Sequence, residues 1–161
     1  MSEPISIEEA LESHGRILYT NVGTSMMPLL RERRDVMVID RPTARLKKYD
    51  VPLYKKNGRY VLHRIIKVRK NDYVIVGDHC TTLEYGITDA DIIGVLTEVI
   101  RDGKPVNLSG FTYKLYYHLW CDLFPIRVLI LRIKAFARAV KRAILGKRKT
   151  ENETKETDKN G

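Results

Sequence analysis

The sequence has few cysteines and no long apolar segment, and these two absences exclude several classes of protein. The only cysteines among its 161 residues are Cys80 and Cys121, and two cysteines form neither a disulfide framework nor a four-ligand zinc pattern. We expect both thiols to be free and buried, because an unpaired cysteine behaves as a small apolar side chain. No window of about 18 apolar residues is free of charge, so the sequence predicts no clear transmembrane helix.

The N-terminus lacks the features of a secretory signal. Met1–Pro4 contains an acidic residue, and no apolar core region follows it, so we expect no cleavable signal peptide. Hydrophobic residues make up 43% of the chain and charged residues 30%, which is enough apolar material for a packed core and excludes disorder throughout. The length fits one domain, or one domain with an attached segment.

Acidic residues are absent from residues 123–149, and this segment carries the excess positive charge of the chain. Residues 1–122 contain 18 basic and 16 acidic residues, whereas residues 123–149 contain nine basic residues and no acid. A protein that binds nucleic acid through its body more often spreads basic residues over it. We therefore expect no nucleic acid partner, and the basic segment needs an explanation of its own.

Short segments rich in valine, isoleucine and tyrosine make up most of the chain after residue 15. An N-terminal helical segment, residues 1–14, precedes them: Ser6–Ser13 has a capping-box pattern, and Gly15 is a stop signal. The predicted strands are Arg16–Asn21, Val36–Asp40, Val51–Lys55, Tyr60–Val68, Tyr73–Val76 and Ile92–Ile100.

Turn residues separate these strands. Asn57-Gly58 is a hairpin signal, Lys70–Asp72 is a second turn, and Asp102-Gly103 is expected to end the strand series. Short strands without intervening helices indicate a mainly β fold, so we predict a compact antiparallel domain over residues 15–110.

The segment of residues 111–149 differs from the β region. It begins with aromatic residues, and apolar residues then recur at helical spacing from Ile126 to Ile144, with most basic residues on the other side. A basic amphipathic helix beside aromatic residues fits an anionic membrane surface. We therefore predict peripheral membrane association through residues 113–149, with the face of the membrane left open. The alternative is a helix that packs on the β domain and keeps its basic face solvated.

Two features are expected to end this segment. Gly146 is predicted to stop the helix, and the polar residues 150–161 are predicted to form a disordered tail.

The run Gly23–Pro28 contains a candidate nucleophile, Ser25. This serine follows a predicted strand directly, where its hydroxyl can be exposed and nearby backbone N–H groups can be free to bind an oxyanion. Taken alone the run does not identify a catalytic serine, because a serine in a turn near a proline is commonly structural.

The stretch Val61–Ile66 contains a candidate general base, His63. Strand alternation places His63 on the same face as Val61 and Ile65. Such a histidine is usually a hydrogen-bonded core residue, but a neutral imidazole is also the expected base for a serine hydroxyl near neutral pH.

Several carboxylates follow that could orient the histidine in the required tautomer. They are Asp78, Glu84, Asp89 and Asp91, and the residues alone leave the choice open. His79-Cys80 offers a rival thiol nucleophile without a base of its own, and His14 and His118 are expected at the surface.

Over residues 20–100, these stretches resemble the signal peptidase I family of serine peptidases and occur in the family's order. Gly23–Pro28 resembles the nucleophile box, Leu62–Ile66 the base box, and Gly77-Asp78 the later Gly-Asp box. The stretches Arg34–Val38, Tyr49–Pro52 and Ile92–Val95 resemble intervening and closing strands.

The sequence also departs from the family pattern. Arg34 stands where the family usually has glycine, and Gly23 stands where many members have a hydroxyl residue that helps to bind the oxyanion. The backbone N–H of Ser25, helped by Thr24, would then bind the oxyanion. Most bacterial members have lysine at the base position, so His63 resembles the endoplasmic-reticulum and archaeal branch.

The resemblance implies a signal peptidase/LexA-type β fold and cleavage of an extended signal or leader peptide after small residues, without a metal or organic cofactor. Ser25 would be the nucleophile and His63 the base, with Asp78 ranked before Glu84 as the orienting acid. Two alternatives remain. One is a LexA-like self-cleaving regulator, which would need a DNA-binding domain before the strands. The other is a non-catalytic peptide-binding module at a membrane surface.

Overall fold

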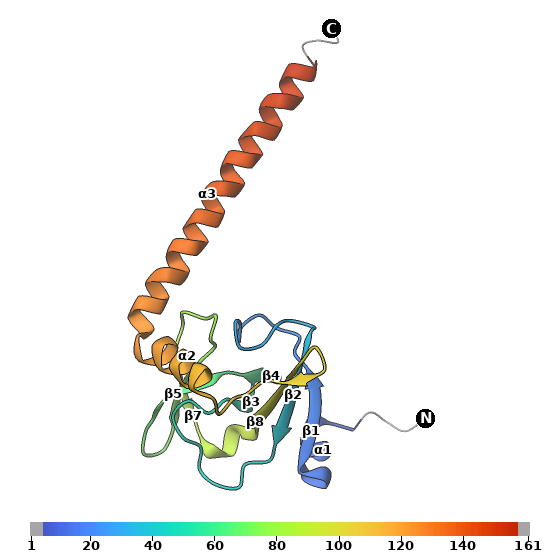
Figure 1. The fold of residues 1–161 in the computed structure, drawn as a ribbon, viewed down its shortest axis with the longest axis vertical. Helices are drawn as coiled ribbons and strands as arrows, with labels where there is room; N and C mark the ends of the chain where they lie inside the picture. Colours follow the sequence, from blue (N-terminus) through green and yellow to red (C-terminus); the bar gives the residue numbers. More distant parts are fainter. Residues whose placement is uncertain (1–4, 158–161) are drawn as a thin grey trace. The chain divides into compact units, whose positions relative to one another are not determined.

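The computed structural model describes the backbone of residues 5–157 and the side chains of residues 5–142. Over the described residues the fold is mainly β, with two antiparallel sheets and three α-helices (Figure 1). In chain order the elements are α1 (Ile7–His14), β1 (Arg16–Thr20), β2 (Asp35–Asp40), β3 (Pro52–Lys56), β4 (Arg59–Leu62), β5 (Arg64–Val68), β6 (Tyr73–Val76), β7 (Glu84–Ile87), the 3₁₀ helix η1 (Asp89–Asp91), β8 (Ile92–Arg101), β9 (Lys104–Pro105), α2 (Phe111–Asp122) and α3 (Phe124–Thr157).

The chain divides into two compact units, and the first ends at Leu123. Helix α2 therefore belongs to the β unit, whereas the sequence-based boundary was placed before residue 111. The second unit begins at Phe124 and contains α3.

Helix α1 has the predicted caps at both ends. The Ser6 side chain accepts from the backbone N–H of Glu9, and the Glu9 carboxylate accepts from the backbone N–H of Ser6, which completes the capping box. Gly15 ends the helix in the left-handed conformation, with φ of 70°, which glycine adopts without steric cost.

The larger sheet has the strand order β1-β2-β8-β3-β4, with β9 paired to β8. The predicted Asn57-Gly58 turn joins β3 to β4, and both residues have positive φ, as the favoured two-residue hairpin requires. Asp102-Gly103 does not end the strand series, because it forms a second such turn that leads into β9. β1 and β4 are the two edges of the main strand path.

The smaller sheet has the order β5-β6-β7. The prediction of one continuous strand from Tyr60 to Val68 is wrong, because the chain leaves the larger sheet after β4 and enters the smaller sheet at β5. His63 is the single residue between these two strands. The change of sheet thus places the candidate base at the junction between two strands.

Each sheet contributes to an apolar core. The first core contains Leu11 of α1, Met26 and residues of β2, β3 and β8, whereas the second is built around Tyr54, Ile65 and Ile75. Met26 is 1% exposed, so the residue directly after Ser25 is anchored in the first core. This anchor fixes the turn that carries the candidate nucleophile.

Helix α3 extends beyond its predicted end. It continues through Gly146 to Thr157, so the predicted stop and the predicted disorder of residues 150–157 are wrong. One internal glycine costs about 1 kcal/mol relative to alanine, and the surrounding lysine, arginine and glutamate residues favour a helix. Residues 158–161 lie outside the described part of the chain. Among the described residues, no helix is both long enough and apolar enough to cross a membrane.

Candidate active site

Ser25 lies in the turn between β1 and β2, with its side chain half-buried. The preceding loop is held by Asn21, whose side-chain amide donates to the carbonyl of Gly23 at 2.7 Å. On the other side, the carbonyl of Ser25 accepts from the backbone N–H of His79 at 2.7 Å. In the described part of the chain, neither the hydroxyl nor the backbone N–H of Ser25 makes a hydrogen bond.

His63 is held by a glutamate. Its Nδ1 lies 2.7 Å from Oε1 of Glu84, at the start of β7, and the His63 side chain is only 12% exposed. The hydroxyl of Tyr54 donates to the same carboxylate oxygen at 2.9 Å, and Nζ of Lys56 lies 2.5 Å from Oε2. Glu84 therefore receives three donors while it holds the Nδ1 edge of the imidazole.

The electrostatics of this pair set the protonation of the ring. Burial alone would raise the pKa of Glu84, but the hydrogen bonds from Lys56, Tyr54 and His63 outweigh it, so the pKa is lowered. Burial lowers the pKa of His63, although Glu84 acts in the opposite direction. Glu84 is thus ionised and His63 neutral near pH 7. An ionised carboxylate only accepts, so Nδ1 carries the ring proton and Nε2 is left as a base.

Gly77 brings Nε2 and the serine turn together. A Cβ atom on this glycine would lie 2.9 Å from Nε2 of His63 and 2.7 Å from the backbone oxygen of Ser25. Both distances are too short for a carbon contact, so only glycine fits at position 77 without a shift of its neighbours. The free nitrogen of His63 and the backbone oxygen of Ser25 therefore both lie around the space that a side chain at position 77 would occupy.

Asp78, the acid ranked first from the sequence, makes its hydrogen bonds elsewhere. Its carboxylate is fully buried and forms a two-point ion pair with the Arg64 guanidinium, at 2.9 and 2.7 Å. The geometry therefore favours the reverse ranking, with Glu84 against the imidazole. The sequence could not separate the two acids, because His63 and Arg64 are neighbours and the change of sheet decides which acid each one meets.

Aromatic residues of α2 secure the Asp78 turn, a role that the sequence analysis missed. The Tyr116 hydroxyl donates to the Asp78 carboxylate at 2.6 Å, and Nε1 of Trp120 donates to the Asp78 carbonyl at 2.5 Å. The Tyr113 hydroxyl accepts from Arg64 at 3.0 Å. These rings were interpreted as part of a membrane-surface segment, but the structure places them half-buried against the candidate site.

An apolar cavity of about 450 Å³ lies beside Ser25 and His63. Its walls come mainly from the larger sheet, and they include Ile17 and Tyr19 of β1 and Tyr60 of β4. The predicted nucleophile and base therefore line one cavity, together with both edge strands of the sheet.

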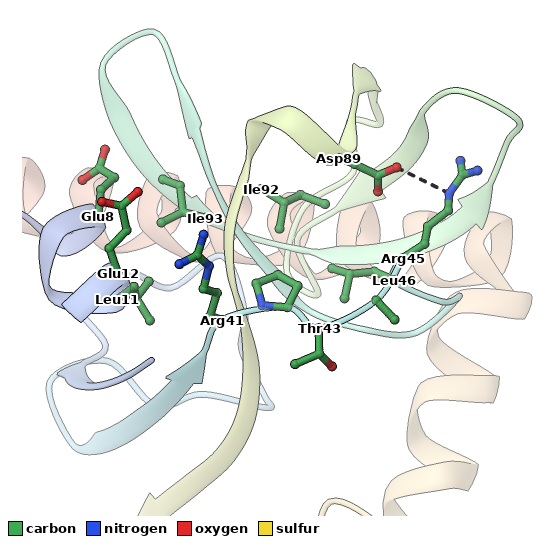
Figure 2. Close-up of a pocket in the computed structure, with 12 residues that line it drawn as sticks. Glu8, Leu11, Glu12, Arg41, Thr43, Arg45, Leu46, Asp89, Ile92 and Ile93 are labelled. Atoms are coloured by element: carbon green, nitrogen blue, oxygen red, sulfur yellow. Dashed lines mark ion pairs between the residues drawn. The ribbon is translucent and has the colours of Figure 1, made fainter. Parts of the chain in front are cut away.

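A second cavity, of about 520 Å³, contains charged residues of both signs (Figure 2). Glu8 and Glu12 of α1 lie at one end, and an Arg45–Asp89 ion pair of 3.7 Å lies at the other. Glu8 also binds Lys55 and Tyr60. The described residues that line this cavity include no serine, histidine or cysteine, so it holds no nucleophile and base of the predicted kind.

The other candidate acids are engaged in local structure. Asp89 accepts from the Tyr73 hydroxyl, and Asp91 accepts from the backbone and side chain of Thr88 at the start of η1. Neither is hydrogen-bonded to His63.

One of the remaining cysteines lies close to this arrangement. A Cβ atom on Gly77 would lie 2.8 Å from Sγ of Cys80, so this rival thiol lies beside Nε2 of His63. His14 and His118 are exposed, as expected. Within the described residues neither cysteine forms a disulfide; Cys121 is buried as predicted, whereas Cys80 is only partly buried. Among the residues that the structure describes, no group of three histidine, cysteine or acidic side chains could hold a metal ion.

The chain matches no protein-family model and no curated protein sequence.

Proposed function

We propose that the protein is a serine endopeptidase with a signal peptidase/LexA-type fold, which cleaves an extended signal or leader peptide. One observation carries the proposal. His63 presents a neutral Nε2 toward Gly77, its Nδ1 is held by the ionised Glu84, and the backbone oxygen of Ser25 approaches the same point of Gly77, with both residues lining one cavity. The order of the Ser25, His63 and Gly77-Asp78 stretches, which resembles the signal peptidase I family, supports the same function.

In the proposed mechanism, Ser25 Oγ attacks the scissile carbonyl carbon and Nε2 of His63 accepts the hydroxyl proton. Glu84 remains ionised and stabilises the resulting imidazolium. The backbone N–H of Ser25, with Thr24 beside it, binds the oxyanion. The imidazolium then protonates the leaving amine, and water repeats the sequence to release the acyl group. None of these steps uses a metal or an organic cofactor.

The cavity also suits an extended peptide. β1 and β4 end the main strand path of the larger sheet, and both contribute residues to the cavity walls. A free strand edge offers unpaired backbone groups to which an extended peptide can add as a further strand. The apolar walls favour apolar side chains of the substrate, and the preference for small residues before the cut follows from the family resemblance.

The test is a cleavage assay of the full chain on a library of unstructured peptides, with products identified by mass spectrometry. The parent protein should produce defined cuts, whereas Ser25→Ala and His63→Ala should each lose on the order of 10³-fold or more in rate. Thermal unfolding of each variant checks that the fold is retained.

Two results would contradict the proposal. One is cleavage at the parent rate by folded Ser25→Ala. The other is peptide binding without any cut by the parent, which would instead favour the non-catalytic binding module.

A further inference from the structure

Helix α3 has an exposed apolar face. Within its described part, six large apolar side chains at three- and four-residue spacing are between 40% and 72% exposed. They are Ile126, Leu129, Ile130, Ile133, Phe136 and Val140. At about 100° per residue, this spacing places all six on one side of the helix. A helix face of this kind is normally covered by another apolar phase, because exposed apolar area is unfavourable in water.

Basic side chains border this face and limit what can cover it. Lys134, Arg138 and Lys141 lie along one border of the stripe, and Arg132 lies along the other. All four are exposed, and the sequence contains no acid between Asp122 and Glu151. Long basic side chains can lie beside an apolar surface while their charged ends reach polar groups above it. The partner must therefore combine an apolar interior with a negatively charged surface.

We propose that α3 lies flat on an anionic lipid surface, with the Ile126–Val140 stripe inserted among the acyl chains and the flanking basic residues at the headgroups. An anionic bilayer provides both parts of this environment over the length of a helix. Nucleic acid matches the charge alone and leaves the apolar stripe exposed, and a protein partner would need an acidic surface around an apolar groove as long as the stripe. The proposal concerns α3 and does not depend on the peptidase activity.

The test compares two variants that add the same charge to opposite sides of one helix. Ile133→Glu places a carboxylate in the apolar stripe, whereas Ala135→Glu places it about 200° away around the helix, at an exposed position on the polar side. The full chain is mixed with vesicles of phosphatidylglycerol and phosphatidylcholine, or of phosphatidylcholine alone, and binding is measured by co-sedimentation. Circular dichroism checks the helix content of both variants.

The parent protein should bind the anionic vesicles at low salt, bind neutral vesicles much less, and bind more weakly as salt increases. Ile133→Glu should lose about tenfold or more in vesicle affinity, and Ala135→Glu should lose clearly less. Ser25→Ala should bind like the parent, which separates this result from the peptidase assay.

Three outcomes would overturn the proposal. The first is no binding to anionic vesicles at low salt, and the second is equal binding to neutral and anionic vesicles. The third is an equal loss in the two glutamate variants, which would show that α3 attracts polyanions by charge alone and that the apolar stripe is not inserted.

Discussion

Two acid–base pairs begin at neighbouring residues of the chain and have opposite properties. Arg64 binds Asp78 in a pair whose two side chains are 0% exposed. His63 binds Glu84 in a pair whose side chains are 12% and 16% exposed and which lies beside the apolar cavity. The first pair is closed to solvent and to substrate, whereas the second retains a free ring nitrogen. Burial and access, more than residue type, therefore distinguish a structural carboxylate from one that can support chemistry.

The largest effect is expected on stability, from Asp78→Asn. A neutral amide leaves the Arg64 charge buried without its partner, and breaking a buried ion pair in this way costs about 3–5 kcal/mol. Denaturant unfolding of this variant and of Glu84→Gln would test the comparison. The two acids would be equivalent in the fold, contrary to our account, if both variants unfolded at the same denaturant concentration.

The next effect concerns activity, from Glu84→Gln. The amide loses the negative charge that stabilises the imidazolium and can hold the ring in the wrong tautomer, so the cleavage rate should fall on the order of 10²-fold or more. Initial rates, corrected for the folded fraction, should fall much less for Asp78→Asn. The opposite order would assign the orienting role to Asp78, as the sequence-based ranking did.

A smaller effect is expected from the aromatic contacts of α2. Tyr116→Phe removes one hydrogen bond to the Asp78 carboxylate while keeping the ring, which should lower the free energy of unfolding by about 1.5–3 kcal/mol. Tyr117→Phe on the same helix is the control, since the Tyr117 ring stacks on Tyr49 and is not hydrogen-bonded to Asp78. Equal unfolding of the two variants would show that α2 does not support the Asp78 turn.

The smallest effect concerns the pH profile. Burial lowers the pKa of His63, and the neutral ring is the base, so activity should be full at neutral pH and decline as pH falls through a pKa below about 6.5. Glu84 raises the pKa of His63, so the decline in activity should occur at lower pH in Glu84→Gln than in the parent. Asp78→Asn should shift the decline by a smaller amount. A decline centred above the ordinary histidine pKa would contradict the buried, neutral ring.

Local sequence signals predicted the local structure of the β unit well. The capping box of α1, the Asn57-Gly58 hairpin and the strand Tyr73–Val76 are confirmed, because each depends on residues close together in the chain. β7 was missed because Glu84–Ile87 contains a glycine and has no alternating pattern to mark it.

The candidate site was predicted only in part, because its geometry depends on contacts between distant segments. Ser25 and His63 could be identified from their own motifs. The chain passes from one sheet to the other at His63. This passage interrupts the strand at His63, pairs His63 with Glu84 and buries Arg64. No local pattern marks such a passage. The role of Tyr116 and Trp120 was hidden for the same reason, because their partner lies about 40 residues earlier in the sequence.

The central claim is that position 25 lies within reach of the free nitrogen of His63, and Ser25→Cys tests it without a substrate. The measurement is the rate at which iodoacetamide alkylates the introduced thiol against pH, read by mass spectrometry of the peptide that contains position 25. A free thiol has a pKa near 8.5, and a neighbouring imidazolium lowers it by stabilising the thiolate. Our account predicts a pKa well below 8.5 that returns toward 8.5 when His63→Ala is added. An ordinary thiol pKa that does not respond to His63→Ala would contradict the account.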